Sequence, residues 1–149
     1  MTSPRHKTLA AFLALALGPL GVHRFYLKGL SDWVGWLFPV PTALGLWGVE
    51  RMRELGQDDP LSWVLVPWLG ATLSISCLMA VVYALTPAPK WNATHNPGLP
   101  RDASPGTSQA LTVVVLIAAM LVGTTALMAS LAFSFQRYFE HELQTHASP

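Results

Sequence analysis

The chain has 149 residues, enough for one domain or a small pair, and 52% of them are hydrophobic while only 11% are charged. Soluble proteins average about 25% charged residues, so this composition excludes an ordinary soluble surface. The formal net charge of +1 gives no basic field for nucleic acid, and the single cysteine excludes an internal disulfide and a cysteine-rich metal site.

The first apolar segment, Thr8 to Val22, is too short to cross a bilayer by itself. A bilayer core of about 30 Å requires roughly 20 helical residues. If the helix continues through the following polar and aromatic cluster it reaches that length, which predicts one helix over about residues 8–27. A signal peptide is the alternative, because basic residues precede an apolar stretch of suitable length.

The cluster that follows this segment is expected at the membrane surface. Phe25 and Tyr26 would lie at the level of the headgroups, and Arg24 would extend its guanidinium toward phosphate. A plain interfacial anchor explains this arrangement without a ligand. A contact with a partner protein or a lipid headgroup is the alternative, since arginine pairs bidentately with phosphate or carboxylate.

Three more apolar segments follow. Residues 30–49 contain Pro39 and Pro41, which predicts a kinked spanning helix that reaches about residue 55. Residues 61–85 and 109–135 carry no charge and are predicted to be transmembrane helices.

The connection at residues 50–60 carries signals for both of its helices. Gly56 predicts the end of the second helix. Asp59 followed by Pro60 predicts the N-cap and first residue of the third.

The stretch 86–108 contains five prolines and predicts an extended loop. Its Asn92-Ala93-Thr94 triplet fits the N-glycosylation pattern and is interpreted as a coincidence. Residues 136–149 form a polar tail that is expected to extend the last helix by a turn or two.

Small residues recur every four positions in three of the apolar segments, which predicts close helix packing either within one chain or between copies. They are Ala10, Ala14 and Gly18; Ser76, Ala80 and Ala84; and Ala119 and Gly123. No internal repeat and no cofactor or metal motif is evident.

The predicted fold is an all-α integral membrane protein with four transmembrane helices. Residues 1–60 form an N-terminal helical hairpin, and residues 61–85 and 109–135 form a second helix pair. With four spans, lysine and arginine divide five to four between the two sides, so the positive-inside rule does not decide the orientation. Two basic residues close to the first helix favour a cytoplasmic N-terminus.

The stretches "GPLGVHRFYLKG" and "GLWGVE" resemble the two-transmembrane-helix (TM-two) domain family over about residues 7–55. The chain departs from the family pattern at Lys28-Gly29, where a glycine usually follows the leucine directly, and at Glu50, where aspartate is commoner. The resemblance implies two membrane helices around a short turn and no enzymatic activity. The matching positions are Gly18, Gly21, His23, Arg24, Phe25, Tyr26, Leu27, Trp47 and Glu50.

The leading hypothesis is therefore a non-enzymatic membrane interaction or scaffold module that presents the His-Arg-Phe-Tyr turn at the lipid surface. Its candidate contact residues are the matching positions other than Trp47. The expected partners are the lipid bilayer and a membrane protein or a second copy, without nucleic acid, metal or cofactor. The alternatives are a small channel or transporter component and a membrane enzyme. The expected location is the bacterial cytoplasmic membrane.

Overall fold

The computed structural model describes residues 4–104 and 107–147, and these residues form helices without any strand. The first half contains α1 (Lys7–Leu17), a 3-10 turn (Gly18–Leu20), α2 (Val22–Lys28), α3 (Trp33–Leu37) and α4 (Pro39–Leu55). The second half contains α5 (Pro60–Leu85), α6 (Ala88–His95) and α7 (Gln109–Ala147).

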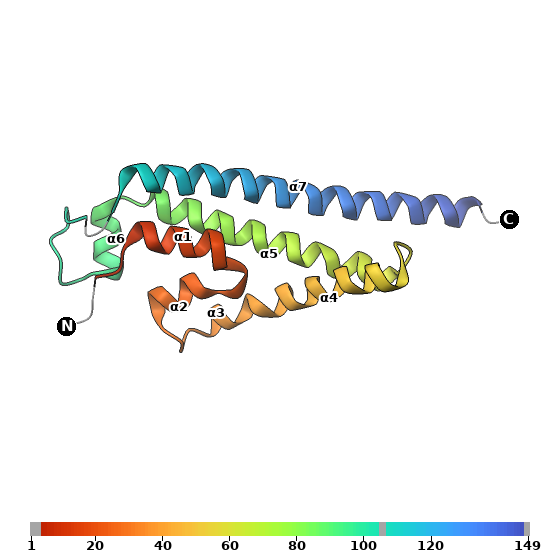
Figure 1. Ribbon diagram of the computed structural model, residues 1–149, viewed down its shortest axis with the longest axis horizontal. Helices are drawn as coiled ribbons and strands as arrows, with labels where there is room; N and C mark the ends of the chain where they lie inside the picture. The colour runs from red at the N-terminus through yellow and green to blue at the C-terminus, as the bar shows by residue number, and fades with distance from the viewer. Residues whose placement is uncertain (1–3, 105–106, 148–149) are drawn as a thin grey trace.

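The longer helices lie along one common axis, with α5 at the centre (Figure 1). Helix α5 packs against α7, α4 and α1. The N-terminus, the α2–α3 turn and α6 lie at one end of the molecule, while the α4–α5 turn and the C-terminus lie at the other (Figure 1).

The single helix predicted over residues 8–27 is wrong, because the chain reverses in the middle of this segment. Helix α1 ends at Leu17, and two residues later Pro19 lacks the N–H that a continuing helix would need. Gly21 then adopts a left-handed conformation with φ 73°, and α2 runs back along α1. The backbone N–H of His6 donates to the Tyr26 hydroxyl at 2.9 Å, so the two ends of the segment are adjacent.

The reversal satisfies its own backbone groups. The N–H of Gly21 donates to the Gly18 carbonyl at 2.8 Å, and the Thr42 hydroxyl donates to the Pro19 carbonyl at 2.7 Å. A Cβ atom on Gly21 would collide with the carbonyl oxygen of Gly35. The turn therefore lies directly against the start of the next helical segment.

The small residues are used inside this chain. Ala14, Cys77, Ala80 and Ala119 form one buried cluster that joins α1, α5 and α7. A Cβ on Gly18 would collide with the Ser76 side chain of α5. Of the two uses expected for these small residues, the structure shows close helix packing within one chain.

The second apolar segment forms α3 and α4, which are interrupted only at Phe38. Pro39 and Pro41 lie in the first turn of α4, where a missing N–H breaks no helical hydrogen bond. The predicted helix signals of the next connection are confirmed. Gly56 ends α4 with its N–H on the Met52 carbonyl, and Asp59 caps α5.

The stretch 86–108 is folded where it is described, and the prediction of an extended loop is wrong for its first part. Residues 88–95 form α6, and the Asn92 side chain is buried. Its amide donates to three backbone carbonyls, those of Pro100, Arg101 and Ala103. This amide is enclosed by its own loop, which agrees with the interpretation of the Asn-Ala-Thr triplet as a coincidence.

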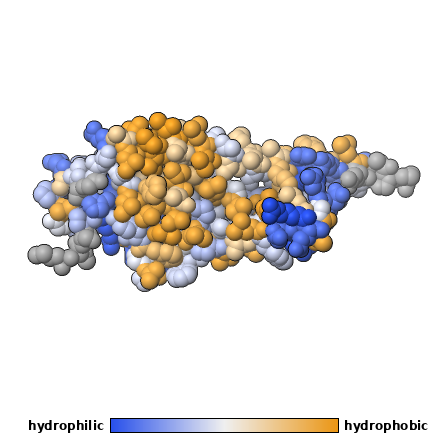
Figure 2. Space-filling view, in the orientation of Figure 1, coloured by the Kyte–Doolittle hydropathy of each residue, from blue (hydrophilic) through white to orange (hydrophobic). Residues whose placement is uncertain are grey.

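Within the described residues, two helices are long and apolar enough to cross a membrane, Pro60–Leu85 and residues 109–143 of α7. The predicted fourth span lies within α7, and the helix continues through the predicted polar tail to Ala147. Figure 2 shows apolar side chains over the central part of the visible face and hydrophilic ones near the two ends of the described chain.

We expect Gly21→Ala to lower the stability of the folded chain in detergent micelles by at least about 1–2 kcal/mol. An alanine at positive φ costs roughly this much, and the collision with Gly35 adds to the cost. Gly98→Ala is the matched control, because a Cβ at Gly98 meets nothing within 4 Å. Equal thermal midpoints for the two variants would contradict the reversal at Gly21.

Candidate functional site

His23 lies in the first turn of α2 and is fully buried. Its ring packs edge-on against Phe38, with centroids 5.3 Å apart, and at 5.9 Å from the ring of Tyr83 on α5. Neither ring nitrogen has a hydrogen-bond partner among the described residues. The imidazole therefore joins α2 to the α3–α4 junction and to α5, and it is not presented at the surface.

Arg24 is bound by the turn that follows α2. Its Nε donates to Oδ2 of Asp32 at 2.6 Å and its Nη2 to Oδ1 at 3.4 Å. The arginine side chain is 19% exposed and the aspartate side chain 10%. The bidentate capacity that the sequence suggested for a ligand is occupied by an aspartate of the same chain.

Tyr26 and Leu27 pack at the end of the molecule that contains the N-terminal segment and α6. Leu27 is buried with Ala10 and Trp91, and Tyr26 packs against the same cluster. The indole N–H of Trp91 donates to the Arg5 carbonyl at 2.9 Å. Together with the bond from His6 to the Tyr26 hydroxyl, these contacts join α2, α6 and the N-terminal segment.

The remaining predicted site residues are divided between two places. Gly18 and Gly21 are buried in the reversal, and Phe25 stacks at a tilt on Trp36, with centroids 5.1 Å apart. Glu50 lies near the opposite end, in α4, where it is exposed and 3.6 Å from Arg53. The structure therefore separates Glu50 from the other seven residues, which lie in the reversal and in α2. Their contact with a partner or headgroup stays a prediction.

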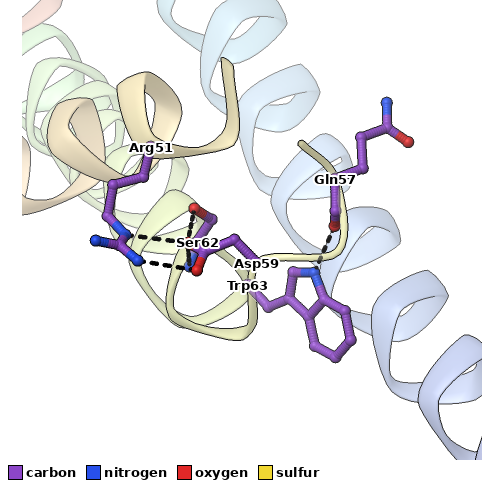
Figure 3. Close-up of polar contacts among 5 residues, drawn as sticks. All are labelled: Arg51, Gln57, Asp59, Ser62 and Trp63. Carbon is purple, nitrogen blue, oxygen red and sulfur yellow. Dashed lines mark hydrogen bonds and ion pairs between the residues drawn. The ribbon is translucent and has the colours of Figure 1, made fainter. Parts of the chain in front are cut away.

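A second arginine turn lies at the other end of the molecule (Figure 3). Arg51 of α4 donates from Nε and Nη2 to the two carboxylate oxygens of Asp59 at 3.0 and 2.9 Å. Asp59 also accepts from the backbone N–H and the hydroxyl of Ser62. The indole N–H of Trp63 donates to the Gln57 carbonyl at 2.8 Å.

The two turns have the same design. In the first, Gly29 ends α2 at φ 84° and ψ 173°, and in the second Gly56 ends α4 at φ 91° and ψ 177°. An aspartate three residues later is the N-cap of the next helix and binds an arginine eight residues before it. The Trp36 indole N–H donates to the Leu30 carbonyl at 3.0 Å, as Trp63 does in the other turn.

This likeness extends to the sequence, and the earlier finding of no internal repeat is wrong. Residues 16–36 and 43–63 align without a gap at an offset of 27 positions, and nine of the 21 pairs are identical. We call the two stretches the first and second repeat. The identical pairs are Ala16 and Ala43, Leu17 and Leu44, Gly18 and Gly45, Gly21 and Gly48, Val22 and Val49, Arg24 and Arg51, Gly29 and Gly56, Asp32 and Asp59, and Trp36 and Trp63.

The two repeats run in opposite directions. The first turn joins α2 to α3 at the end of the molecule that contains the N-terminus, and the second joins α4 to α5 at the far end (Figure 1). The signal that could have identified them is the pattern Arg-x4-Gly-x2-Asp-x3-Trp, which occurs at residues 24–36 and again at 51–63.

Both turn aspartates are held in their charged form. The hydrogen bond from Arg24 is the main reason why the pKa of Asp32 is below its ordinary value. The hydrogen bond from Arg51, followed by that from Ser62, lowers the pKa of Asp59 well below its usual range. Each turn therefore keeps its ion pair at neutral pH without adding net charge.

Residues 3–51 match the family model described as TM2 domain, which is about a third of the chain. The matched region contains the whole first repeat and ends at Arg51, so most of the second turn lies beyond it. No curated protein and no solved structure matches the chain.

We expect Asp59→Asn to lower the thermal midpoint by a few degrees at neutral pH. Asparagine still caps α5 but cannot form the charged, bidentate pair with Arg51. Asp58→Asn, in the same exposed turn, is the control and should leave the midpoint unchanged.

The same pair of proteins gives a test of pH dependence. Because the pKa of Asp59 is lowered by folding, its contribution to stability is complete above the ordinary value of about 4 and is lost as the pH falls toward the folded value. The difference between wild type and Asp59→Asn should be constant from pH 7 to about 5 and shrink below about 4. A difference that instead grows on acidification would contradict the ion pair.

Proposed function

Because residues 3–51 form a TM2 domain, we propose that this TM2 domain-containing protein is a multi-pass integral membrane protein that acts as a non-catalytic scaffold. The membrane location agrees with the domain and with the two apolar helices. The proposed membrane is the bacterial cytoplasmic membrane, and the proposed partners are the bilayer and another membrane protein or a second copy.

In this proposal the chain crosses the membrane three times and enters it once without crossing. Helix α1 has 11 residues, about 16 Å at 1.5 Å per residue, which is about half of a 30 Å core. Residues 33–55 of α3 and α4 extend about 34 Å by the same measure, enough for a crossing. Helices α5 and α7 provide the other two crossings.

The observation that carries the scaffold proposal is the inward direction of the His-Arg-Phe-Tyr segment. His23 is fully buried against two neighbouring elements, and Arg24 is paired with Asp32. An exposed contact site would leave its arginine free for a ligand. Here the segment instead packs the hairpin of α1 and α2, which in this proposal enters the membrane without crossing it, against α3 and α5. Such packing is the role of a structural unit.

Arg24→Lys tests this role. A scaffold should lose thermal stability by a few degrees, because lysine cannot reproduce the two hydrogen bonds to Asp32. Arg53→Lys, in the exposed pair with Glu50 at the other end of the molecule, is the control and should behave as wild type. An Arg24→Lys protein that is as stable as wild type but loses a cross-linked partner in cells would contradict the scaffold and support an exposed contact site.

A transporter component is the second candidate, and the repeats are the observation that favours it. Inverted repeats and broken helices accompany substrate sites near the midplane in many transporters. The reversal at residues 18–21 breaks a helix, and beside it lies His23, a buried ionisable group without a hydrogen-bond partner in the described chain.

Flux measurements distinguish the two candidates. Purified protein in liposomes should pass no protons down an imposed pH gradient if it is a scaffold. A flux that His23→Phe abolishes, while the protein stays folded, would favour transport. Phenylalanine suits this test because it keeps an aromatic ring between Phe38 and Tyr83.

A further inference from the structure

The reversal of the first segment changes which charges lie at which end of the molecule. In a chain with four full crossings, the N-terminus and the His-Arg-Phe-Tyr turn would lie on opposite sides. In this structure the backbone N–H of His6 donates to the Tyr26 hydroxyl, and the indole N–H of Trp91 donates to the backbone carbonyl of Arg5. The ammonium group of Lys7 donates to the Thr86 carbonyl at 3.0 Å. The N-terminal segment, α2 and the stretch after α5 therefore share one end.

The two ends differ in sign. We call the end with the N-terminus the basic end; it carries six basic and two acidic side chains, a net charge of +4. The other, acidic end has three basic and six acidic side chains, a net charge of −3. The basic end contains Arg5, Lys7, Arg24, Lys28, Lys90, Arg101, Asp32 and Asp102, and the acidic end Arg51, Arg53, Arg137, Glu50, Glu54, Asp58, Asp59, Glu140 and Glu142.

The two ends also differ in how many of their basic side chains form ion pairs. At the acidic end all three basic residues have ion pairs, with Asp59, Glu50 and Glu140. At the basic end only Arg24 is paired. The other five cations form no ion pair with a carboxylate in the described residues, and three of them, Lys28, Lys90 and Arg101, are exposed.

We propose that the basic end lies in the cytoplasmic leaflet and binds anionic phospholipid headgroups through Arg5, Lys7, Lys28, Lys90 and Arg101. This inference rests on the proposed multi-pass arrangement. The ratio of six to three basic residues satisfies the positive-inside rule, which five to four did not. Unpaired basic side chains beside the membrane are attracted to the negative surface of that leaflet, and the acidic end would be repelled by it.

Cysteine labelling tests the orientation. In a Cys77→Ala background, which removes the only native thiol, Ser31→Cys reports on the basic end and Leu55→Cys on the acidic end. Both native residues are exposed and uncharged; Ser31 precedes α3, and Leu55 is the last residue of α4. A membrane-impermeant maleimide should label Leu55→Cys in intact bacterial cells and Ser31→Cys only after the cells are broken.

The other outcomes separate the two proposals. Labelling of Ser31→Cys but not Leu55→Cys in intact cells would overturn the proposed orientation and leave the multi-pass proposal standing. Labelling of both sites under the same condition would mean that α3 and α4 do not cross the membrane, and both proposals would fail.

Lipid binding is measured with the purified full chain in detergent micelles containing either phosphatidylglycerol or phosphatidylcholine. The thermal midpoint should rise by a few degrees in phosphatidylglycerol relative to phosphatidylcholine. The triple variant Lys28→Gln, Lys90→Gln, Arg101→Gln should lose most of this difference, because it removes the three exposed cations. Arg53→Gln, which removes a cation from the acidic end, should keep it. The same midpoint in both lipids, or a difference that the triple variant retains, would overturn the lipid site.

Discussion

The fold depends on one constraint, that a chain which turns back among packed helices must satisfy its buried backbone groups without water. Within the segment from Gly18 to Gly21, the Gly21 N–H donates to the Gly18 carbonyl, the Thr42 hydroxyl donates to the Pro19 carbonyl, and the Gly21 carbonyl accepts from N–H groups of α2. Gly21 has no Cβ, so the turn can lie against Gly35. Because this turn holds, α2 can return to the N-terminus and α3 can start on the same side.

The repeats show that similar sequences can follow different paths. The first repeat reads Gly-Pro-Leu-Gly at residues 18–21 and breaks the helix, whereas the second reads Gly-Leu-Trp-Gly at 45–48 and stays helical within α4. Pro19 is the local part of the difference, because it removes an N–H that Leu46 retains. In α4 the two glycines have another use: a Cβ on Gly45 or Gly48 would collide with α5.

Much of the fold follows from local signals in the sequence. The uncharged runs over 61–85 and 109–135 predicted α5 and the apolar part of α7, and the Gly56, Asp59, Pro60 signals fixed the boundary between α4 and α5. Such signals act within a few residues. The reversal was missed because its cause is distributed. Pro19 breaks the helix, but Thr42 and Gly35, which lie 23 and 16 residues further along the chain, allow the broken chain to turn.

The site was less predictable than the fold, for a related reason. The sequence could not tell whether Arg24 faces a ligand or Asp32, because the phosphate or carboxylate of a ligand and the carboxylate of an aspartate can accept the same two hydrogen bonds. The composition of residues 86–108, with its five prolines, also did not indicate that the Asn92 amide would donate to three backbone carbonyls of its own loop. Those bonds depend on where α6 is placed, and α6 is held by Trp91 and the N-terminal segment.

The ion pairs of the two turns are not the source of the difference in charge between the ends of the molecule. A helix reversal leaves N–H groups at the start of the next helix. Asp59 accepts a hydrogen bond from one of them, that of Ser62, whereas Asp32 lies at the N-cap position of α3 and binds Arg24. In each turn the arginine eight residues earlier cancels the charge of the aspartate, so these two ion pairs do not contribute to the difference between the ends. The difference comes from the remaining side chains, and these can be assigned to a side only after the reversal at Gly21 is known.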